Sequence, residues 1–176
     1  MNLLHDVPLG EKAPEAFYAV IEIPKGSTNK YEIDKKTGLI KLDRVSYTSQ
    51  FYPFDYGFAP QTWWHDDDPL DVILLTTYPL FPGILAEVRP VGAALMTDSG
   101  DQDDKIIAVP MKDPHFETLK DISDVSEHTK KEIKHFFETY KLLQNKIVEV
   151  TAFEDRKKAL AIVKESQALY RKKFSR

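Results

Sequence analysis

The segment Phe17-Tyr18-Ala19-Val20-Ile21-Glu22-Ile23, followed by Pro24, opens the part of the chain that decides the fold. Its β-branched and aromatic residues are typical of a strand, and Pro24 ends it because proline has no N–H to donate to a neighbouring strand. Glu22 interrupts the apolar run, and a carboxylate at such a position requires a buried partner or a metal-bound water. We therefore predict a strand over 17–23 that carries one acid in need of a partner.

Strand patterns continue outward from this segment. Residues 30–34 alternate polar and apolar side chains, which places Lys30, Glu32 and Asp34 on one face. Residues 34–38 then form a hairpin loop that leads into a strand at 39–42. Further strands are predicted at 71–77, 84–89, 91–96, 105–109 and 146–153.

The last third of the chain changes to helical periodicity. From an N-cap at Ser126, apolar residues form one helical face at Ile133, Phe136, Phe137, Tyr140 and Leu143. A second amphipathic helix is predicted over 154–174. Short strands followed by helices favour an α+β fold, a small β-barrel with helices packed outside. Because no repeat or linker divides the sequence, we expect a single domain over 1–176.

Composition narrows the class of protein. Hydrophobic residues make up 42% and charged residues 30%, and the formal net charge is −4, which gives no general attraction to nucleic acid or to an anionic membrane. The absence of cysteine excludes disulfides, thiolate zinc sites and a cysteine nucleophile. The N-terminus reaches charge and proline too early for a signal peptide, and no apolar run has membrane-spanning length. We therefore expect a cytoplasmic protein that binds neither nucleic acid nor membrane.

Aspartates gather in two short windows. Eight of the 16 lie in 66–71 and 98–105, and the first window reads Asp66-Asp67-Asp68-Pro69-Leu70-Asp71. Acidic residues are common in solvent-exposed turns without any further role. Here Asp66, Asp68 and Asp71 lie on one turn stiffened by Pro69, and their carboxylates repel one another unless a cation neutralises them. Oxygen ligands select hard cations, Mg²⁺ ahead of Mn²⁺ or Ca²⁺. An EF-hand does not fit, because its glycine position would be Asp71.

Four cations accompany these windows. Lys30 and Arg44 lie on or beside the early strands, Lys105 closes the second window, and Lys141 follows Tyr140 on the predicted helix. Each alone is more often a solvated surface charge than a ligand group. Together with the aspartates they are typical of a phosphoryl-transfer site, with metals at one end and cationic clamps at the other.

Two other classes stay open on the residues alone. A small OB-type nucleic-acid-binding module would need a basic groove with stacking aromatics, whereas these loops are acidic. A non-catalytic protein that binds divalent ions would explain the aspartates and leave the cations without a role. The five histidines show no metal-ligand spacing.

The string from Asp66 to Val72 resembles the motif of the soluble family I inorganic pyrophosphatases, in their short prokaryotic form. The similarity covers nearly the whole chain. It includes residues 21–24, 30–34, 43–44, 51–53, 55–57, 78–80, 89–92, 96–98, 103–105 and 135–141. The resemblance implies a twisted, closed, five-stranded barrel of OB-like shape with flanking helices. It also implies hydrolysis of pyrophosphate to two phosphates and a homohexamer built as a dimer of trimers. Thr139 replaces a histidine that some members have, whereas His135 is retained.

The resemblance also implies a role for each polar residue. Several Mg²⁺ ions, replaceable by Mn²⁺ or other divalent ions, would be held by Asp66, Asp71, Asp98 and Asp103. Asp68 would be the base that takes the proton of the attacking water. The groups that contact the phosphates would be Lys30, Arg44, Tyr56, Lys105, Tyr140 and Lys141. The residues that support the metal ligands or metal-bound waters would be Glu22, Glu32 and Tyr52.

Overall fold

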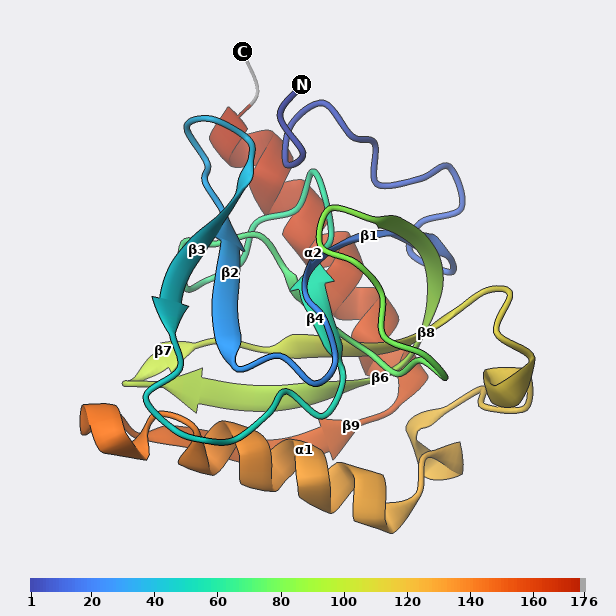
Figure 1. The fold of residues 1–176 in the computed structure, drawn as a ribbon. Coiled ribbons are helices and arrows are strands. Elements are labelled where there is room, and N and C mark those ends of the chain that lie inside the picture. The colour runs from blue at the N-terminus through green and yellow to red at the C-terminus, as the bar shows by residue number, and fades with distance from the viewer. Residues whose placement is uncertain (175–176) are drawn as a thin grey trace.

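The central feature of the fold is a ring of strands (Figure 1). The structure, a computed structural model, describes residues 1–174. Seven strands form one mixed sheet: β1 (Phe17–Ile23), β4 (Asp55–Phe58), β5 (Asp71–Leu74), β6 (Leu85–Asp98), β7 (Asp101–Gln102), β8 (Lys105–Pro110) and β9 (Val148–Glu154). The pairings β1–β4, β4–β5, β5–β8, β8–β6 and β6–β1 close the ring. Among residues 1–174, no helix is long and apolar enough to cross a membrane.

A separate two-stranded sheet, β2 (Asn29–Ile33) and β3 (Ile40–Val45), stands beside the ring (Figure 1). Its loop is held by Asp34, whose Oδ1 accepts hydrogen bonds from the backbone N–H groups of Lys36 at 3.1 Å and Thr37 at 2.8 Å. Gly38 follows at φ 75°, a conformation that residues with a Cβ rarely adopt. The hairpin predicted from the sequence is confirmed.

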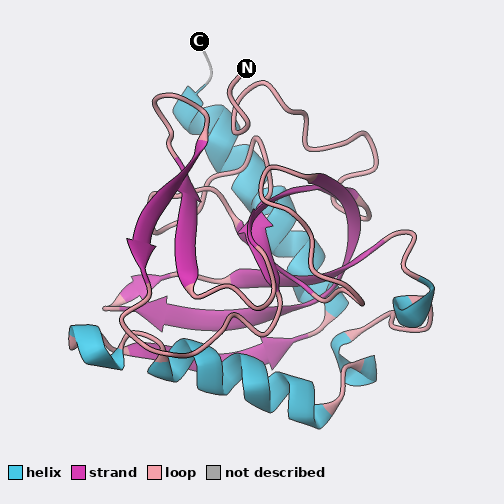
Figure 2. Cartoon of the chain, viewed as in Figure 1, coloured by secondary structure: helices cyan, strands magenta, loops and turns pink. Residues whose placement is uncertain are grey.

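Two long helices pack on different sides of the strands (Figure 2). They are α1 (Glu127–Thr139) and α2 (Arg156–Phe174), and short 3-10 turns occur at η1 (Pro114–Phe116), η2 (Ile122–Asp124) and η3 (Leu142–Gln144). Alternate residues of β5 explain why both helices are needed. Ile73 packs in the cluster that includes Phe136 and Phe137 of α1, whereas Val72 packs in the cluster that includes Ile162 of α2. A strand buried on both faces therefore has a continuous apolar sequence.

Several predicted bounds were wrong. The two strands predicted at 84–89 and 91–96 are one strand, β6 (Leu85–Asp98), because Pro90 lies at an irregularity in the pairing with β8, where proline's missing N–H is tolerated. The first helix ends at Thr139, not 143, and Leu143 is 68% exposed, so it is no part of the core face. The helix N-cap at Ser126 is confirmed, since its Oγ accepts a hydrogen bond from the Thr129 N–H.

The strand β4 was not predicted, because its four residues include an acid and a glycine. Gly57 is required there. A Cβ at this position would lie 1.9 Å from the Val20 carbonyl oxygen, so only glycine lets β4 approach β1. This close pairing completes one side of the ring and places Tyr56 opposite Ile73 of β5, from where its hydroxyl reaches the Asp71 side chain.

Candidate active site

The sheet topology brings the two aspartate windows together. Strands β5 and β8 are parallel neighbours, and their first residues, Asp71 and Lys105, are register partners. Asp66 and Asp68 lie in the loop that leads into β5, and Asp103 lies just before β8. Because both strands begin at the same edge, segments more than 30 residues apart in sequence meet at one point.

Three of these carboxylates form a compact group. Asp66, Asp71 and Asp103 each offer one carboxylate oxygen, and these oxygens lie within 4.8 Å of one another. Burial, and then the charges of Asp71 and Asp103, raises the pKa of Asp66 to about 8. Half-buried carboxylates that disfavour each other's ionisation fit a divalent cation, which would neutralise all three.

One ammonium group lies against this acidic triad. Lys105 Nζ donates hydrogen bonds to Asp71 Oδ2 at 2.6 Å and to Asp103 Oδ1 at 2.7 Å, and its side chain is 2% exposed. Burial alone would lower the pKa of Lys105, but Asp103 and Asp71 raise it well above its usual value. The Tyr56 hydroxyl also donates to Asp71 Oδ2, at 2.5 Å, and burial raises its pKa well above the usual value. Lysine and tyrosine thus fix Asp71 from two sides.

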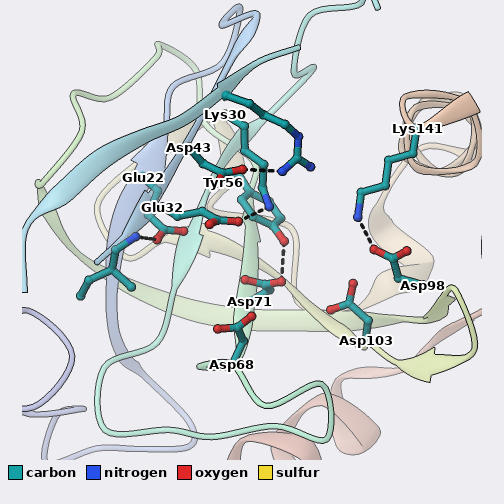
Figure 3. A network of polar contacts seen from close by, with 12 residues as sticks. Glu22, Lys30, Glu32, Asp43, Tyr56, Asp68, Asp71, Asp98, Asp103 and Lys141 are labelled. Atoms are coloured by element: carbon teal, nitrogen blue, oxygen red, sulfur yellow. Dashed lines mark hydrogen bonds and ion pairs between the residues drawn. The ribbon is translucent and has the colours of Figure 1, made fainter. Parts of the chain in front are cut away.

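Further cations lie around Asp71 and Asp103 of the triad, each paired with an acid (Figure 3). Lys30 pairs with Glu32 on β2, and Lys141, just after α1, pairs with Asp98 at the end of β6. Burial lowers the pKa of Lys141, whereas Asp98 raises it. Burial would raise the pKa of Asp98, but its hydrogen bond with Lys141 leaves it below the usual value. Asp98 therefore faces Lys141 and is not one of the three grouped carboxylates.

Glu22 has the buried partner that its sequence position demands. Its Oε1 accepts a hydrogen bond from the Ile33 N–H at 2.6 Å, which ties β1 to β2. Burial, and then the charge of Asp71, raises the pKa of Glu22 well above its usual value. Glu22 is 5% exposed, yet it also lines the site, so it both joins the hairpin to the ring and adds to the acidic wall.

A single cavity of about 590 Å³ holds nearly all the predicted residues. It is lined by Glu22, Lys30, Glu32, Tyr52, Tyr56, Asp66, Asp68, Asp71, Asp98, Asp103, Lys105, Tyr140 and Lys141. Arg44 is the exception. It is the register partner of Lys30 on β3, but its guanidinium pairs with Asp43 and does not line the cavity.

The structure adds cavity residues that the sequence did not single out. Lys35, in the loop between β2 and β3, forms an ion pair with Asp68. Burial raises the pKa of Asp68, and Lys35 acts in the opposite direction. Lys36, Lys41 and Lys146 also line the cavity. The one signal for Lys35 was its place directly after an alternating strand whose polar face carries Lys30 and Glu32.

The site combines carboxylates that need a cation with ammonium groups that can bind an anion. This combination defines a site of the phosphoryl-transfer class. Comparison with known proteins specifies the family. Residues 19–171 match the inorganic pyrophosphatase family, and the chain belongs to it. That family hydrolyses pyrophosphate to two phosphates.

The relatives match over nearly the whole chain. An inorganic pyrophosphatase of Thermus thermophilus is 52% identical over 97% of this chain and 99% of its own length, and one of Picrophilus torridus is 45% identical over 98% and 97%. A crystal structure of inorganic pyrophosphatase from Thermus thermophilus has 51% identity and a TM-score of 0.93, covering 97% of this chain and 99% of that one.

Proposed function

We propose that this protein hydrolyses pyrophosphate with Mg²⁺ ions bound at the acidic triad and a water activated there. The observation that supports this most directly is the convergence of Asp66, Asp71 and Asp103 in a cavity whose other wall carries lysines. Asp98 would join the triad as a further metal ligand when substrate binds. Bound magnesium would lower the pKa of a water and neutralise phosphate charge.

Asp68 is the proposed base. Its side chain is about half exposed (52%), so it can accept a proton from a water in the cavity, and Lys35 favours its ionised form. It stands two residues from Asp66 without belonging to the triad. A carboxylate beside the metal ligands and free of them can take a proton without releasing a cation.

The remaining residues would bind the two phosphates. Lys30, Lys141 and Lys105 supply positive charge, Tyr140 supplies a hydroxyl donor, and Tyr56 would supply another once its hydroxyl turns from Asp71. Arg44 would join them once its guanidinium leaves Asp43 and turns toward the substrate, because its backbone lies directly beside Lys30. Glu22, Glu32 and Tyr52 would hold metal-bound waters or the ligands themselves.

The proposal extends to the architecture and assembly. One domain over 1–176 carries the site, and residues 175–176 of that domain lie outside the described structure. The ring of five strands is a small OB-like barrel. Large apolar side chains stay exposed in the single chain, Tyr78, Phe81 and Ile147 each at more than 70%. Such exposure supports contacts between copies of the chain, and the assembly that we propose is a homohexamer. A cytoplasmic location remains part of the proposal.

The decisive experiment measures phosphate release from pyrophosphate, ATP and a phosphomonoester. Each substrate is tested with Mg²⁺ and with excess chelator. We expect fast release from pyrophosphate with Mg²⁺, little from the other two, and none from any substrate after chelation. Turnover that survives chelation, or a preference for ATP, would overturn the proposal. A protein that binds Mg²⁺ without releasing phosphate would identify the non-catalytic alternative.

A further inference from the structure

The aspartate loop, residues 66–70 directly before β5, contains one residue in a conformation that its side chain disfavours. Asp67 has a φ of 66°, in the left-handed region that favours glycine. It stands between Asp66, a member of the acidic triad, and Asp68, the proposed base. Because the backbone reverses at Asp67, its conformation sets the directions in which both neighbouring carboxylates leave the chain.

Contacts from outside the loop hold Asp67 in place. Its Oδ1 accepts a hydrogen bond from Trp63 Nε1 at 3.1 Å and pairs with Lys173 in the last turn of α2. Its backbone carbonyl accepts a hydrogen bond from Lys35 Nζ at 3.0 Å. The side chain is 77% exposed, so burial does not fix it. The hydrogen bonds and the ion pair are what restrain this residue.

Trp63 is the centre of these contacts. It is 7% exposed, and its ring has Lys173 Nζ 4.1 Å and Lys35 Nζ 5.0 Å from the centroid, both within range of a cation–π interaction. Phe174 packs edge-on at 5.0 Å. One indole ring therefore joins three separate parts of the chain, the hairpin loop, the end of α2 and the aspartate loop.

We propose that Trp63 and Lys173 are positioning residues for the acidic site, which hold Asp67 in its left-handed conformation and thereby aim Asp66 and Asp68. This inference rests on the proposed function, because that function supplies the metal that the aspartate loop would bind. The exposed Lys173 pair alone contributes little, because surface ion pairs are weak. The packed indole, with its donor fixed by the core, carries most of the effect.

The proposal makes a specific demand on position 67. Glycine adopts positive φ without help, so Asp67→Gly needs neither the indole donor nor Lys173. Asp67→Ala loses the acceptor and keeps the steric penalty. Asp67→Ala should therefore weaken Mg²⁺ binding more than Asp67→Gly does, an order opposite to the usual ranking of alanine and glycine in regular structure.

The test is a Mg²⁺ titration by calorimetry, which does not depend on turnover. Trp63→Phe keeps an aromatic ring and removes the donor, and we expect it to weaken Mg²⁺ binding about tenfold, as changes behind metal ligands do. Lys173→Ala should weaken binding by a smaller factor. The matched control is Lys172→Ala, which removes the same charge from the same turn at an exposed position. It should bind as the wild type does.

A double variant separates positioning from general support of the fold. In an Asp67→Gly background, Trp63→Phe should cost little further Mg²⁺ affinity. An equal tenfold loss with and without glycine at 67 would overturn the proposal, and so would wild-type affinity in Trp63→Phe. Failure of the proposed function would appear separately, as a wild-type protein that binds Mg²⁺ normally and releases no phosphate.

Tryptophan fluorescence gives a second test should Trp63→Phe fail to fold. Trp63 and Trp64 are the two tryptophans of the chain, so Trp64→Phe leaves Trp63 as the single reporter. Its emission should change on Mg²⁺ addition with the midpoint that calorimetry gives. Adding Lys173→Ala should move both midpoints together. Emission that ignores Mg²⁺ while calorimetry shows binding would refute the coupling.

Discussion

Replacing Lys105 by methionine tests how the acidic triad is neutralised. Methionine keeps a long unbranched side chain of similar volume and removes the ammonium that lies 2.6 Å from Asp71 and 2.7 Å from Asp103. Without a metal, the carboxylates of Asp71 and Asp103 then lie close to each other and to Asp66, with no cation between them. The folded state should become less stable in chelator and regain stability when Mg²⁺ takes over the neutralising role.

The size of the effect follows from burial. Removing one partner of a buried pair costs about 3–5 kcal/mol. The side chains of Asp71 and Asp103 remain 19% and 13% exposed, so we expect the lower end, about 3 kcal/mol. For a chain of this size 1 kcal/mol shifts Tm by about 2–4 °C. Lys105→Met should therefore melt about 6–12 °C below the wild type in chelator.

The assay is thermal unfolding followed by circular dichroism, in chelator and in millimolar Mg²⁺. Lys130→Met is the control, because Lys130 pairs with Glu127, which is 81% exposed, and should cost less than about 1 kcal/mol under either condition. Mg²⁺ should raise the Tm of Lys105→Met more than that of the wild type. Equal melting temperatures in chelator, or an equal response to Mg²⁺, would refute the reasoning.

Four further predictions follow from the site. Asp71→Asn should require more Mg²⁺ and recover part of its activity at high Mg²⁺. Asp68→Asn should bind Mg²⁺ nearly normally and lose about 10²–10⁴-fold in kcat. The reverse result in matched calorimetry and kinetics would exchange the roles of Asp68 and Asp71. Arg44→Lys should lower kcat/KM by the equivalent of about 1–3 kcal/mol of transition-state stabilisation, because an ammonium cannot make two parallel hydrogen bonds to phosphate. Wild-type kinetics in this variant would remove Arg44 from the site. Because the pKa of Asp66 is about 8 without metal, Mg²⁺ binding below that pH must displace a proton, so Mg²⁺ affinity should fall as pH drops from 9 to 7. Calorimetry in buffers of different ionisation enthalpy detects the released proton. Equal apparent binding enthalpies in those buffers would contradict this prediction. Light scattering should give a hexamer, and a monomer at micromolar concentrations would contradict the proposed assembly.

The sequence predicted local structure where the pattern is regular over several residues. The 17–23 strand, the hairpin after Lys30 and the capped start of α1 all agree with the structure. The prediction was wrong where a long-range contact decides. A proline inside β6 suggested two strands, because an irregularity in pairing with β8 cannot be read from one segment. The short β4 exists because Gly57 can approach Val20.

The candidate site shows the same division. The aspartate windows and lysines were visible because repeated like charges on a short turn demand a counter-ion. Which carboxylates group together was not visible, since that depends on the parallel pairing of Asp71 with Lys105. The part played by Trp63 was also hidden. A tryptophan beside another suggests ordinary core packing, and only the φ angle of Asp67 and its hydrogen bond from the indole reveal its use.

Two cations at the site form ion pairs with acids that the proposed reaction would use. Lys141 pairs with Asp98, and Lys35 pairs with Asp68. An anion that drew Lys141 away would leave Asp98 uncompensated, and a cation that bound Asp98 would leave the buried ammonium of Lys141 without its partner. Both changes are costly when they occur separately. A magnesium–pyrophosphate complex supplies both charges at once, so the separated groups find new partners in the same event. Metal and substrate binding are therefore thermodynamically linked in the proposed reaction, and each should raise the affinity for the other.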